Sequence, residues 1–350
     1  MSTSTKKSKL GQFYTTNYEY ILQAFVIPDN IPIIEPFAGN GDLLKIVNPG
    51  RAIECYDIDP KKEFIIRRDT LLDPPSFHQK YVLTNPPYLA KNKSTNKEIY
   101  DLYGCDDLYK CFIELLTRNI CEGGIMIVPL NFISSIRVGD IQLRKRFVSV
   151  YNIIRINIFE ETVFDDTTYT VCSIQFHKKP HDPHSNVVGD IISTVYPAKK
   201  QLPFMLNESN NYTIGGEIYS LPQSTVYKIE RATKLTKNAE CITNILAKCI
   251  DDSIQRKIHL SITNDAGRYI DNTANLSERS YATLVITPAL NIEQQMVLAE
   301  RTNRLLEEYR ARYNSLFLSN YRESNSIARK RISFGLIFQL CGHVLLEMFS

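Results

Sequence analysis

Short apolar runs alternate with helical stretches between residues 31 and 177, and this alternation constrains the fold more than any other feature of the chain. Within residues 108–121 the apolar side chains recur on one helical face, with Asp106 or Asp107 expected as the N-cap and the glycines at 123–124 as the stop. The pattern predicts an α/β fold with a mostly parallel sheet and a late antiparallel strand at residues 168–176. The predicted strands are residues 31–34, 52–56, 81–83, 125–128, 152–158 and 168–176.

A change in composition at residues 178–186, where two prolines stand among polar residues, is typical of a domain boundary. We therefore expect an N-terminal domain over residues 1–180 and a mixed α+β domain over residues 181–350. The apolar segment 332–349 is interrupted by polar side chains, which favours a buried C-terminal helix over a membrane span. A long helix is predicted over residues 291–316, with an apolar stripe of Ile292, Met296, Ala299, Leu306, Tyr309, Tyr313 and Leu316.

Charge and cysteine usage exclude several classes of protein. The formal net charge is +3 over 350 residues, so nucleic-acid binding would have to come from local basic patches. None of the eight cysteines forms a Cys-x-x-Cys pair, and several lie in apolar runs, which indicates reduced, buried thiols rather than disulfides or a zinc site. Residues 1–9 are polar and basic and lack the apolar core of a signal peptide. These features predict a cytoplasmic protein.

The tetrad Asn85-Pro86-Pro87-Tyr88 directly follows the predicted strand at residues 81–83. The Asn85 side-chain oxygen and the Pro86 carbonyl can both accept hydrogen bonds from one planar NH₂ group, and the prolines fix the backbone around them. The Tyr88 ring offers a flat face on which the ring bearing that group can stack. An Asn-Pro-Pro sequence is also an ordinary turn, so the tetrad alone leaves both roles open.

A glycine-containing turn follows the first predicted strand, in the segment Glu35-Pro36-Phe37-Ala38-Gly39-Asn40-Gly41. Gly39 and Gly41 allow the backbone to turn tightly and to approach a ligand closely. The third glycine of the dinucleotide-binding fingerprint is missing, because Leu44 stands in its place. A simple turn accounts for this segment equally well.

Two acidic residues follow further along the chain. Asp57 ends the second predicted strand, where an α/β nucleotide site holds a ribose diol, and Ile58 would then pack against the base. The Asp69 carboxylate is a suitable acceptor for an exocyclic adenine amine. For Asp57, a solvated turn is the alternative.

Thr15 and Thr16 precede a helix predicted over residues 17–25. Either threonine is a natural N-cap for that helix. A helix N-terminus can also receive a carboxylate, so capping and ligand binding both remain open.

Taken together and in this order, the motifs resemble the γ-class, TaqI-like DNA methyltransferases of restriction–modification systems, which use S-adenosylmethionine to methylate adenine N6. The resemblance covers residues 11–178, with the cofactor motifs before the tetrad and the large variable region last. It departs at Thr16, where many relatives have proline. The matching motifs are Gly11-x-Phe13-Tyr14-Thr15, Glu35-Pro-Phe-Ala-Gly39-x-Gly41, Asp57-Ile-Asp59-Pro, Asp69, Asn85-Pro-Pro-Tyr88, Asp107-Leu-Tyr-x-x-Phe112 and Gly123-Gly-Ile-Met-Ile-Val-Pro129.

The resemblance implies a Rossmann-like methyltransferase domain followed by a DNA target-recognition domain that ends in helices. It implies S-adenosylmethionine as the cofactor, double-stranded DNA and a separate cognate restriction endonuclease as partners, and no membrane or metal. The setting would be the cytoplasm of a bacterium or of a virus-infected host cell. The implied cofactor-binding residues are Phe13, Tyr14, Thr15, Glu35, Phe37, Gly39, Gly41, Asp57, Ile58 and Asp69, and the implied catalytic residues are Asn85, Pro86, Pro87, Tyr88 and Phe164.

The resemblance also assigns roles within that set. Thr15 would hold the cofactor carboxylate, Asp57 the ribose hydroxyls and Asp69 the adenine amine of the cofactor. Asn85 would accept a hydrogen bond from the target amine, and Phe164 would lie against a base flipped out of the duplex. The residues alone leave the target base open, since cytosine N4 suits the same chemistry. Methylation of protein glutamine or of RNA, and a non-catalytic DNA-binding subunit, are the alternative functions.

Overall fold

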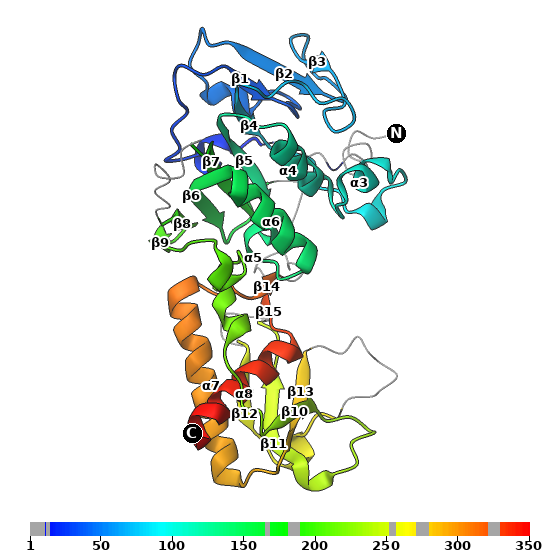
Figure 1. Ribbon diagram of the computed structural model, residues 1–350, viewed down its shortest axis with the longest axis vertical. Helices are drawn as coiled ribbons and strands as arrows, with labels where there is room; N and C mark the ends of the chain where they lie inside the picture. Colours follow the sequence, from blue (N-terminus) through cyan, green and yellow to red (C-terminus); the bar gives the residue numbers. More distant parts are fainter. Residues whose placement is uncertain are drawn as a thin grey trace. The chain divides into compact units, whose positions relative to one another are not determined.

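The structure is a computed structural model that describes residues 11, 15–164, 169–180, 190–251, 257–270, 280–320 and 330–350. The chain divides into two compact units, Met1–Leu206 and Asn207–Ser350. This division falls after the expected boundary at residue 180, because two further strands extend the sheet of the first unit (Figure 1). Residues 181–189, which form most of the expected linker, lie outside the described part of the chain.

The first unit is built on a nine-stranded sheet in the order β3-β2-β1-β4-β5-β7-β6-β8-β9. The strands from β3 to β5 pair in parallel, whereas β7 is antiparallel to both of its neighbours. The predicted α/β fold with a mostly parallel sheet is confirmed, and so is the antiparallel direction of the late strand. The strands are β1 Ile33–Glu35, β2 Ile53–Asp57, β3 Ile66–Arg67, β4 Tyr81–Thr84, β5 Gly123–Pro129, β6 Tyr151–Phe159, β7 Val171–Lys178, β8 Ile192–Tyr196 and β9 Lys200–Gln201.

Helices and loops cover both faces of this sheet. On one face, the Phe147 ring of α6 packs at 5.1 Å from the Phe176 ring of β7, and α4 packs beside α6. On the other face, the Ser173 hydroxyl of β7 donates a hydrogen bond to the Ile21 carbonyl at 2.7 Å, which attaches α2 to the sheet. The helices are α2 Tyr18–Ile21, α3 Glu98–Tyr103, α4 Leu108–Arg118, α5 Asn131–Ser134 and α6 Val138–Val150, with 3₁₀ turns at Leu43–Ile46 and Lys91–Lys93.

The helix predicted over residues 17–25 is too long, because α2 spans only Tyr18–Ile21. Ala24 has a left-handed φ of 65°, which no right-handed helix accommodates. The N-cap is Asn17, and its side chain makes no capping hydrogen bond, so neither Thr15 nor Thr16 caps the helix.

The predicted end of the helix at residues 108–121 is also wrong. Helix α4 begins after Asp107 as expected, although the Asp107 side chain makes no capping hydrogen bond to it. It ends at Arg118, with Asn119 as the C-cap. The glycines at 123–124 belong to β5, where both are buried and paired with β4 and β7.

The second unit combines a four-stranded antiparallel sheet, in the order β10-β13-β11-β12, with two long helices. Its mixed α+β character and terminal helix agree with the expected fold class. The elements are β10 Lys228–Arg231, β11 Ile242–Lys248, β12 His259–Ile262, β13 Tyr281–Thr287, α7 Ile292–Tyr313, β14 Ser319–Asn320, β15 Lys330–Arg331 and α8 Phe334–Phe349, with 3₁₀ turns at Glu208–Asn210, Gly216–Ser220, Ala239–Cys241 and Asp265–Gly267.

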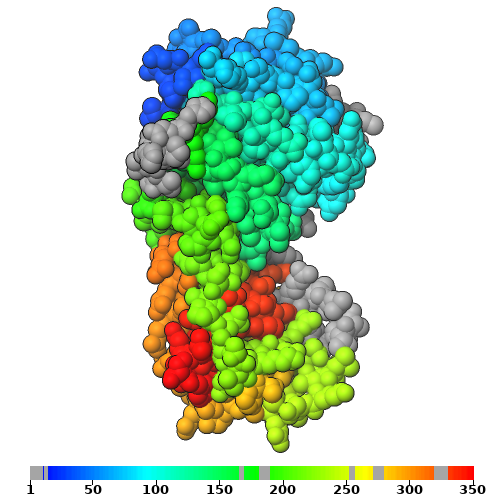
Figure 2. All heavy atoms as spheres, viewed as in Figure 1, coloured from blue at the N-terminus to red at the C-terminus, as the bar shows by residue number. Residues whose placement is uncertain are grey.

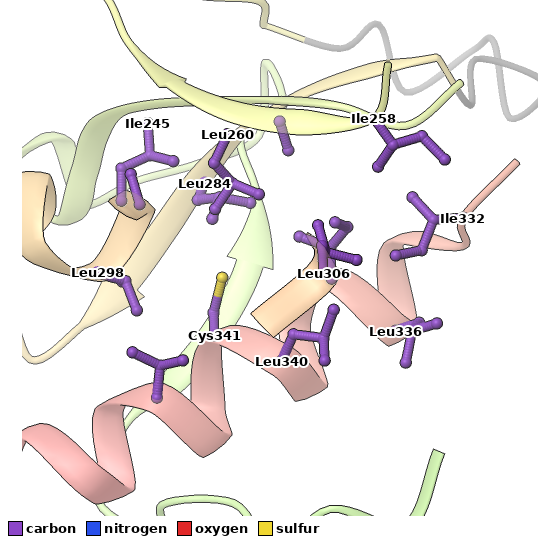
Figure 3. Packing of buried hydrophobic residues seen from close by; sticks show 14 of the residues in the cluster. Ile245, Ile258, Leu260, Leu284, Leu298, Leu306, Ile332, Leu336, Leu340 and Cys341 are labelled. Carbon is purple, nitrogen blue, oxygen red and sulfur yellow. The ribbon is translucent and has the colours of Figure 1, made fainter. Parts of the chain in front are cut away.

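A hydrophobic core lies between this sheet and the helices α7 and α8. Side chains from all three elements point toward one another in Figure 3, among them Leu284 of β13, Leu306 of α7 and Leu340 of α8. The burial of α8 confirms the predicted buried C-terminal helix. Within the described residues, no helix combines the length and the apolar character needed to cross a membrane.

The predicted stripe on α7 is only partly correct. Leu306 and Ala299 are buried, but Ile292 is 46% exposed and Met296 is 55% exposed. The buried face is centred on Leu298 and Leu306, and Ile292 lies about 120° around the helix from Leu298 at about 100° per residue. All eight cysteines are free thiols; Cys105 is partly exposed and the others are buried.

Candidate functional site

The candidate site lies where the strand order of the first sheet reverses. Strand β1 has β2 on one side and β4 on the other, so the connections leaving β1 and β4 run in opposite directions across the sheet. In open α/β sheets, ligands bind outside the carboxyl ends of the strands at such a switch point. Glu35 ends β1, Asp57 ends β2, and Asn85 directly follows β4. The topology therefore brings together three motifs that are distant in the sequence.

A cavity of about 280 Å³ opens at this point. Its volume is at the lower end of the roughly 300–1,000 Å³ usual for small-molecule sites. Seven of the predicted site residues line it, namely Phe37, Gly39, Asp57, Ile58, Asp69, Asn85 and Pro87. The other lining residues are Arg68, Thr70, Leu71, Leu72, Leu89, Ser94, Thr95, Asn96, Ile99, Tyr100 and Leu108.

Asp57 fixes the glycine turn beside the cavity. Its Oδ2 accepts a hydrogen bond from the Gly39 backbone N–H at 2.8 Å, and its Oδ1 accepts one from the Asp59 N–H at 2.7 Å. Gly39 has a φ of +54°, which disfavours residues with a side chain. These two hydrogen bonds fix the Asp57 carboxylate at the wall of the cavity.

Apolar and acidic groups from the segments that follow β2 and β3 line the same cavity. Ile58 is 45% exposed and Leu72 is 44% exposed, and both present apolar surface to the cavity. The Asp69 Oδ1 accepts a hydrogen bond from the Leu71 N–H at 3.1 Å, which orients its carboxylate. A flat, polar-edged molecule such as a nucleoside fits this combination of apolar walls and acceptors.

Glu35 is a buried carboxylate at the end of β1. It is 2% exposed, and its Oε2 has no hydrogen-bond partner among the described residues. Burial, together with the nearby carboxylates of Asp42 and Asp57, holds the pKa of Glu35 well above its usual range. An unpartnered buried acid is costly. A ligand with N–H or ammonium donors would satisfy it, and S-adenosylmethionine carries such a group, so the residues present fit this cofactor.

The Asn85 side chain is held at both ends. Its Nδ2 donates a hydrogen bond to the Thr15 Oγ1 at 3.1 Å. Its Oδ1 accepts one from the Tyr88 hydroxyl at 2.6 Å, and that hydroxyl also lies 2.9 Å from the Ile127 carbonyl of β5. The amide oxygen is therefore the end that faces away from Thr15.

The Tyr88 side chain is 3% exposed. Its ring contacts the rings of Tyr109 and Tyr169 edge to face, at 6.0 and 5.7 Å between centroids. Burial raises the pKa of Tyr88 well above its usual value, which keeps the hydroxyl protonated and able to donate. In this arrangement the ring face is covered, so the predicted stacking on a target ring requires the Tyr88 surroundings to open.

Gly11 contacts the tetrad directly. Its carbonyl accepts a hydrogen bond from the Tyr88 N–H at 2.9 Å. Its φ is +67°, and a Cβ at this position would lie 2.6 Å from the Tyr88 carbonyl oxygen, so a side chain does not fit here. Gly11 and Thr15, although distant from the tetrad in the sequence, thus both contact it. The predicted residues Phe13 and Tyr14 lie outside the described part of the chain.

Six of the described predicted residues do not line the cavity: Thr15, Glu35 and Tyr88, described above, and Gly41, Pro86 and Phe164. Gly41 has a φ of +76° and forms the end of the glycine turn. Pro86, the second residue of the tetrad, is buried. Phe164 is 2% exposed. The predicted contact between Phe164 and a flipped base stays a prediction.

The sequence reasoning missed Asp107 as a site residue, although Asp107 stands in one of the matched motifs. Its Oδ1 accepts a hydrogen bond from the Leu89 N–H at 3.1 Å, directly after the tetrad. Ala90 and Asp107 also form an antiparallel bridge. Burial raises the pKa of Asp107 to about 7. The sequence offered one indication of this role: Asp107 directly precedes α4, and the Tyr109 ring of α4 contacts the Tyr88 ring of the tetrad.

Residues 94–100 form one wall of the cavity, to which Ser94, Asn96 and Tyr100 contribute. The segment is not a simple loop, because α3 begins at Glu98. In Figure 2 the α3 segment, coloured cyan, lies at the surface of the first unit.

No family model matches the chain, and no curated protein matches it. Solved structures similar to the chain include a type I restriction-modification methyltransferase subunit from Streptococcus thermophilus, with 16% identity, a TM-score of 0.40, and 58% of this chain and 50% of that chain covered. The EcoKI M protein of a type I restriction enzyme has 13% identity and a TM-score of 0.41, with 99% and 75% covered. A DrdV–DNA complex has 14% identity and a TM-score of 0.41, with 71% and 36% covered.

The chain thus spans half the length of the first of these structures and about a third of the DrdV chain. With identities of 13–16% and TM-scores of 0.40–0.41, these likenesses carry no functional assignment. The function is therefore argued from the chain's own residues.

Proposed function

We propose that the protein is an S-adenosylmethionine-dependent methyltransferase that transfers a methyl group to the N6 amino group of adenine in DNA. The observation that carries the proposal is the position of Asn85. It follows β4 at the switch point of the sheet and lines a cavity with the features of a nucleoside site. In this proposal the Asn85 amide oxygen and the Pro86 carbonyl would lie beside the methyl donor.

The cavity residues support a specific mode of cofactor binding. Asp57 would hold the ribose hydroxyls, since an acid at the end of β2 is the usual ribose ligand of such folds. Asp69 would accept a hydrogen bond from the cofactor's adenine amine, with Ile58 against the ring. Glu35 would pair with the ammonium group near the glycine turn. When bound, the cofactor supplies an electrophilic methyl on a good leaving group.

The chain's own residues would aim the target nitrogen at that methyl. Hydrogen bonds from the two N6 protons to the Asn85 Oδ1 and the Pro86 carbonyl would draw the nitrogen toward tetrahedral geometry and stabilise the positive charge that develops on it. No covalent nucleophile is needed. Positioning and electrostatic stabilisation would supply most of the rate enhancement.

A DNA substrate would have to present an extruded base, because N6 is hydrogen-bonded within the duplex. Extrusion costs a few kcal/mol, which contacts to the DNA backbone would offset. We propose that the second unit, with its four-stranded sheet and long helices, recognises the target sequence. A restriction endonuclease acting at the same sequence would be a separate protein.

The test is transfer of labelled methyl from S-adenosylmethionine to unmethylated genomic DNA. We expect label in DNA, recovered as N6-methyladenine after hydrolysis, and a fall of about 10²–10³ in kcat for Asn85→Ala. The matched control is Asn119→Ala, an exposed asparagine at the end of α4, which should leave kcat unchanged.

Other outcomes separate the alternatives. Label recovered as N4-methylcytosine would retain the mechanism and overturn adenine as the target. Label in RNA or in a glutamine of a protein, with none in DNA, would overturn DNA as the substrate. An absence of transfer to all three would contradict the proposed activity.

A further inference from the structure

The hydroxyl of Thr15 contacts the amide of Asn85, a contact that the sequence motifs do not assign. Thr15 is 4% exposed and lies 70 positions before Asn85 in the sequence. Its Oγ1 accepts a hydrogen bond from the Asn85 Nδ2 at 3.1 Å. The buried hydroxyl thus binds the end of the amide that the reaction does not use.

The orientation of that amide matters because its two ends have nearly the same shape and opposite hydrogen-bonding character. The oxygen is an acceptor, whereas the NH₂ group has two donors. A target amine also presents donors. If the Asn85 amide were turned by about 180°, NH₂ would face NH₂ and no hydrogen bond would form.

The contacts around Asn85 allow its Oδ1 to exchange the hydrogen bond from Tyr88 for one from a substrate, while the Tyr88 hydroxyl keeps an acceptor. The Tyr88 hydroxyl has one hydrogen and two acceptors nearby, the Asn85 Oδ1 at 2.6 Å and the Ile127 carbonyl at 2.9 Å. When a target amine takes the Asn85 oxygen, the Tyr88 hydroxyl can donate to Ile127 instead. The Thr15 contact to Nδ2 is unaffected by that exchange.

We propose that Thr15 is a positioning residue that fixes the Asn85 amide with its oxygen toward the target amino group. This inference rests on the proposed function. It is compatible with the predicted contact to the cofactor carboxylate, because a threonine hydroxyl can donate one hydrogen bond while it accepts another. Positioning of the Asn85 amide would change kcat at saturating S-adenosylmethionine, whereas binding of the cofactor carboxylate would change the affinity for the cofactor.

The kinetic test compares Thr15→Val with Thr15→Ser. Valine keeps the volume and removes the acceptor, and serine restores the acceptor. At saturating S-adenosylmethionine we expect kcat to fall about tenfold for Thr15→Val, because a displaced catalytic group is costly, and to stay within about twofold of wild type for Thr15→Ser. An unchanged kcat at saturation for Thr15→Val, with only a weaker cofactor affinity by calorimetry, would overturn the inference.

A double variant distinguishes positioning from general damage. If Thr15 acts through Asn85, Thr15→Val should have no further effect on kcat in an Asn85→Ala background. An additional tenfold fall there would contradict the inference. Thermal unfolding of Thr15→Val and Thr15→Ser shows whether both variants remain folded.

A third measurement does not depend on activity. With ¹⁵N-asparagine labelling, the side-chain NH₂ signal of Asn85 is identified by its absence from Asn85→Ala. We expect this signal to shift in Thr15→Val and to stay near its wild-type position in Thr15→Ser. An unshifted signal in Thr15→Val would overturn the inference. A shifted signal in a protein that methylates no substrate would support the contact and contradict the proposed function, so the two failures are distinguishable.

Discussion

In the second unit, the side chains enclosed between the sheet and the helices α7 and α8 form an apolar cluster, whereas the first unit buries two acids, Glu35 and Asp57, where its strands end. The buried Gln295 of α7 is satisfied at both ends of its amide, by the Asn244 N–H at 2.7 Å and the Leu290 carbonyl at 2.8 Å. Glu35 in the first unit leaves a buried oxygen without a described partner. This contrast indicates where a ligand can gain binding energy. A buried polar group without a hydrogen-bond partner lowers the stability of the fold, and a ligand that supplies a partner removes that cost.

The largest expected effect comes from the apolar core. Leu306 is fully buried, and its side chain lies among those of α8 and the sheet (Figure 3). Leu306→Ala should lower the free energy of unfolding by about 2–5 kcal/mol, because it removes buried apolar surface and leaves a cavity. Urea denaturation measures this change.

The matched control for the core is Leu235→Ala, since Leu235 is 72% exposed. It should change the free energy of unfolding by less than about 0.5 kcal/mol. Calorimetry should find cofactor affinity unchanged in both leucine variants. A large loss of cofactor affinity in Leu306→Ala alone would break the proposed separation between a stabilising core and a binding site.

The second prediction concerns pH. Burial raises the pKa of Asp107 to about 7, so the folded state holds a proton that the unfolded chain releases near pH 4. The contribution of Asp107 to stability is therefore fully present below about pH 4 and is lost as the pH rises toward 7. Relative to Asp107→Asn, wild type should lose about 3–4 kcal/mol across this window, since each pKa unit corresponds to about 1.4 kcal/mol.

Urea denaturation at a series of pH values measures that difference. The comparison with Asp107→Asn isolates Asp107 from other groups, including Glu35, whose pKa is also raised by burial. Identical pH dependence in the two proteins would show that Asp107 is an ordinary surface acid. It would also weaken the contrast between the two units.

The smallest effect is expected at the cavity wall. Ile58 is 45% exposed and lines the cavity, and Ile66 of β3 is 56% exposed and does not line it. Ile58→Ala should weaken S-adenosylmethionine binding about fivefold, because about 1 kcal/mol of apolar contact is lost. Ile66→Ala should leave the affinity unchanged, and calorimetry compares the two. Equal effects would place the cofactor elsewhere.

The sequence predicted the parts of the fold that depend on local pattern. The buried strands β1, β2, β4, β5 and β6 all lie at the apolar runs expected for them. The helix at residues 17–25 failed because the backbone of Ala24 is left-handed, and nothing in the residue type indicates that.

The candidate site, like the fold, was predicted only in part. Asp57 and Asn85 were found because each stands at the end of a predicted strand, and parallel strands end at one edge of the sheet. Asp69 was chosen for its carboxylate and by the resemblance, and it follows β3, a strand that was not predicted. The contact between Thr15 and Asn85 is made by residues 70 positions apart, so no local pattern reports it. The burial of Tyr88 depends on rings contributed by two other segments, which only the folded chain brings together.

The two strands that extend the first sheet beyond residue 180 have a consequence for protein engineering. Strand β8 pairs in parallel with β6 over the segment from Arg155 to Phe159, and β9 ends the sheet with only two residues, Lys200 and Gln201. A short, polar last strand is a poor template for pairing with another molecule. A fragment cut at residue 180 would expose the longer and more apolar edge of β6 and so invite aggregation, whereas a fragment that continues to Leu206 would keep that edge covered.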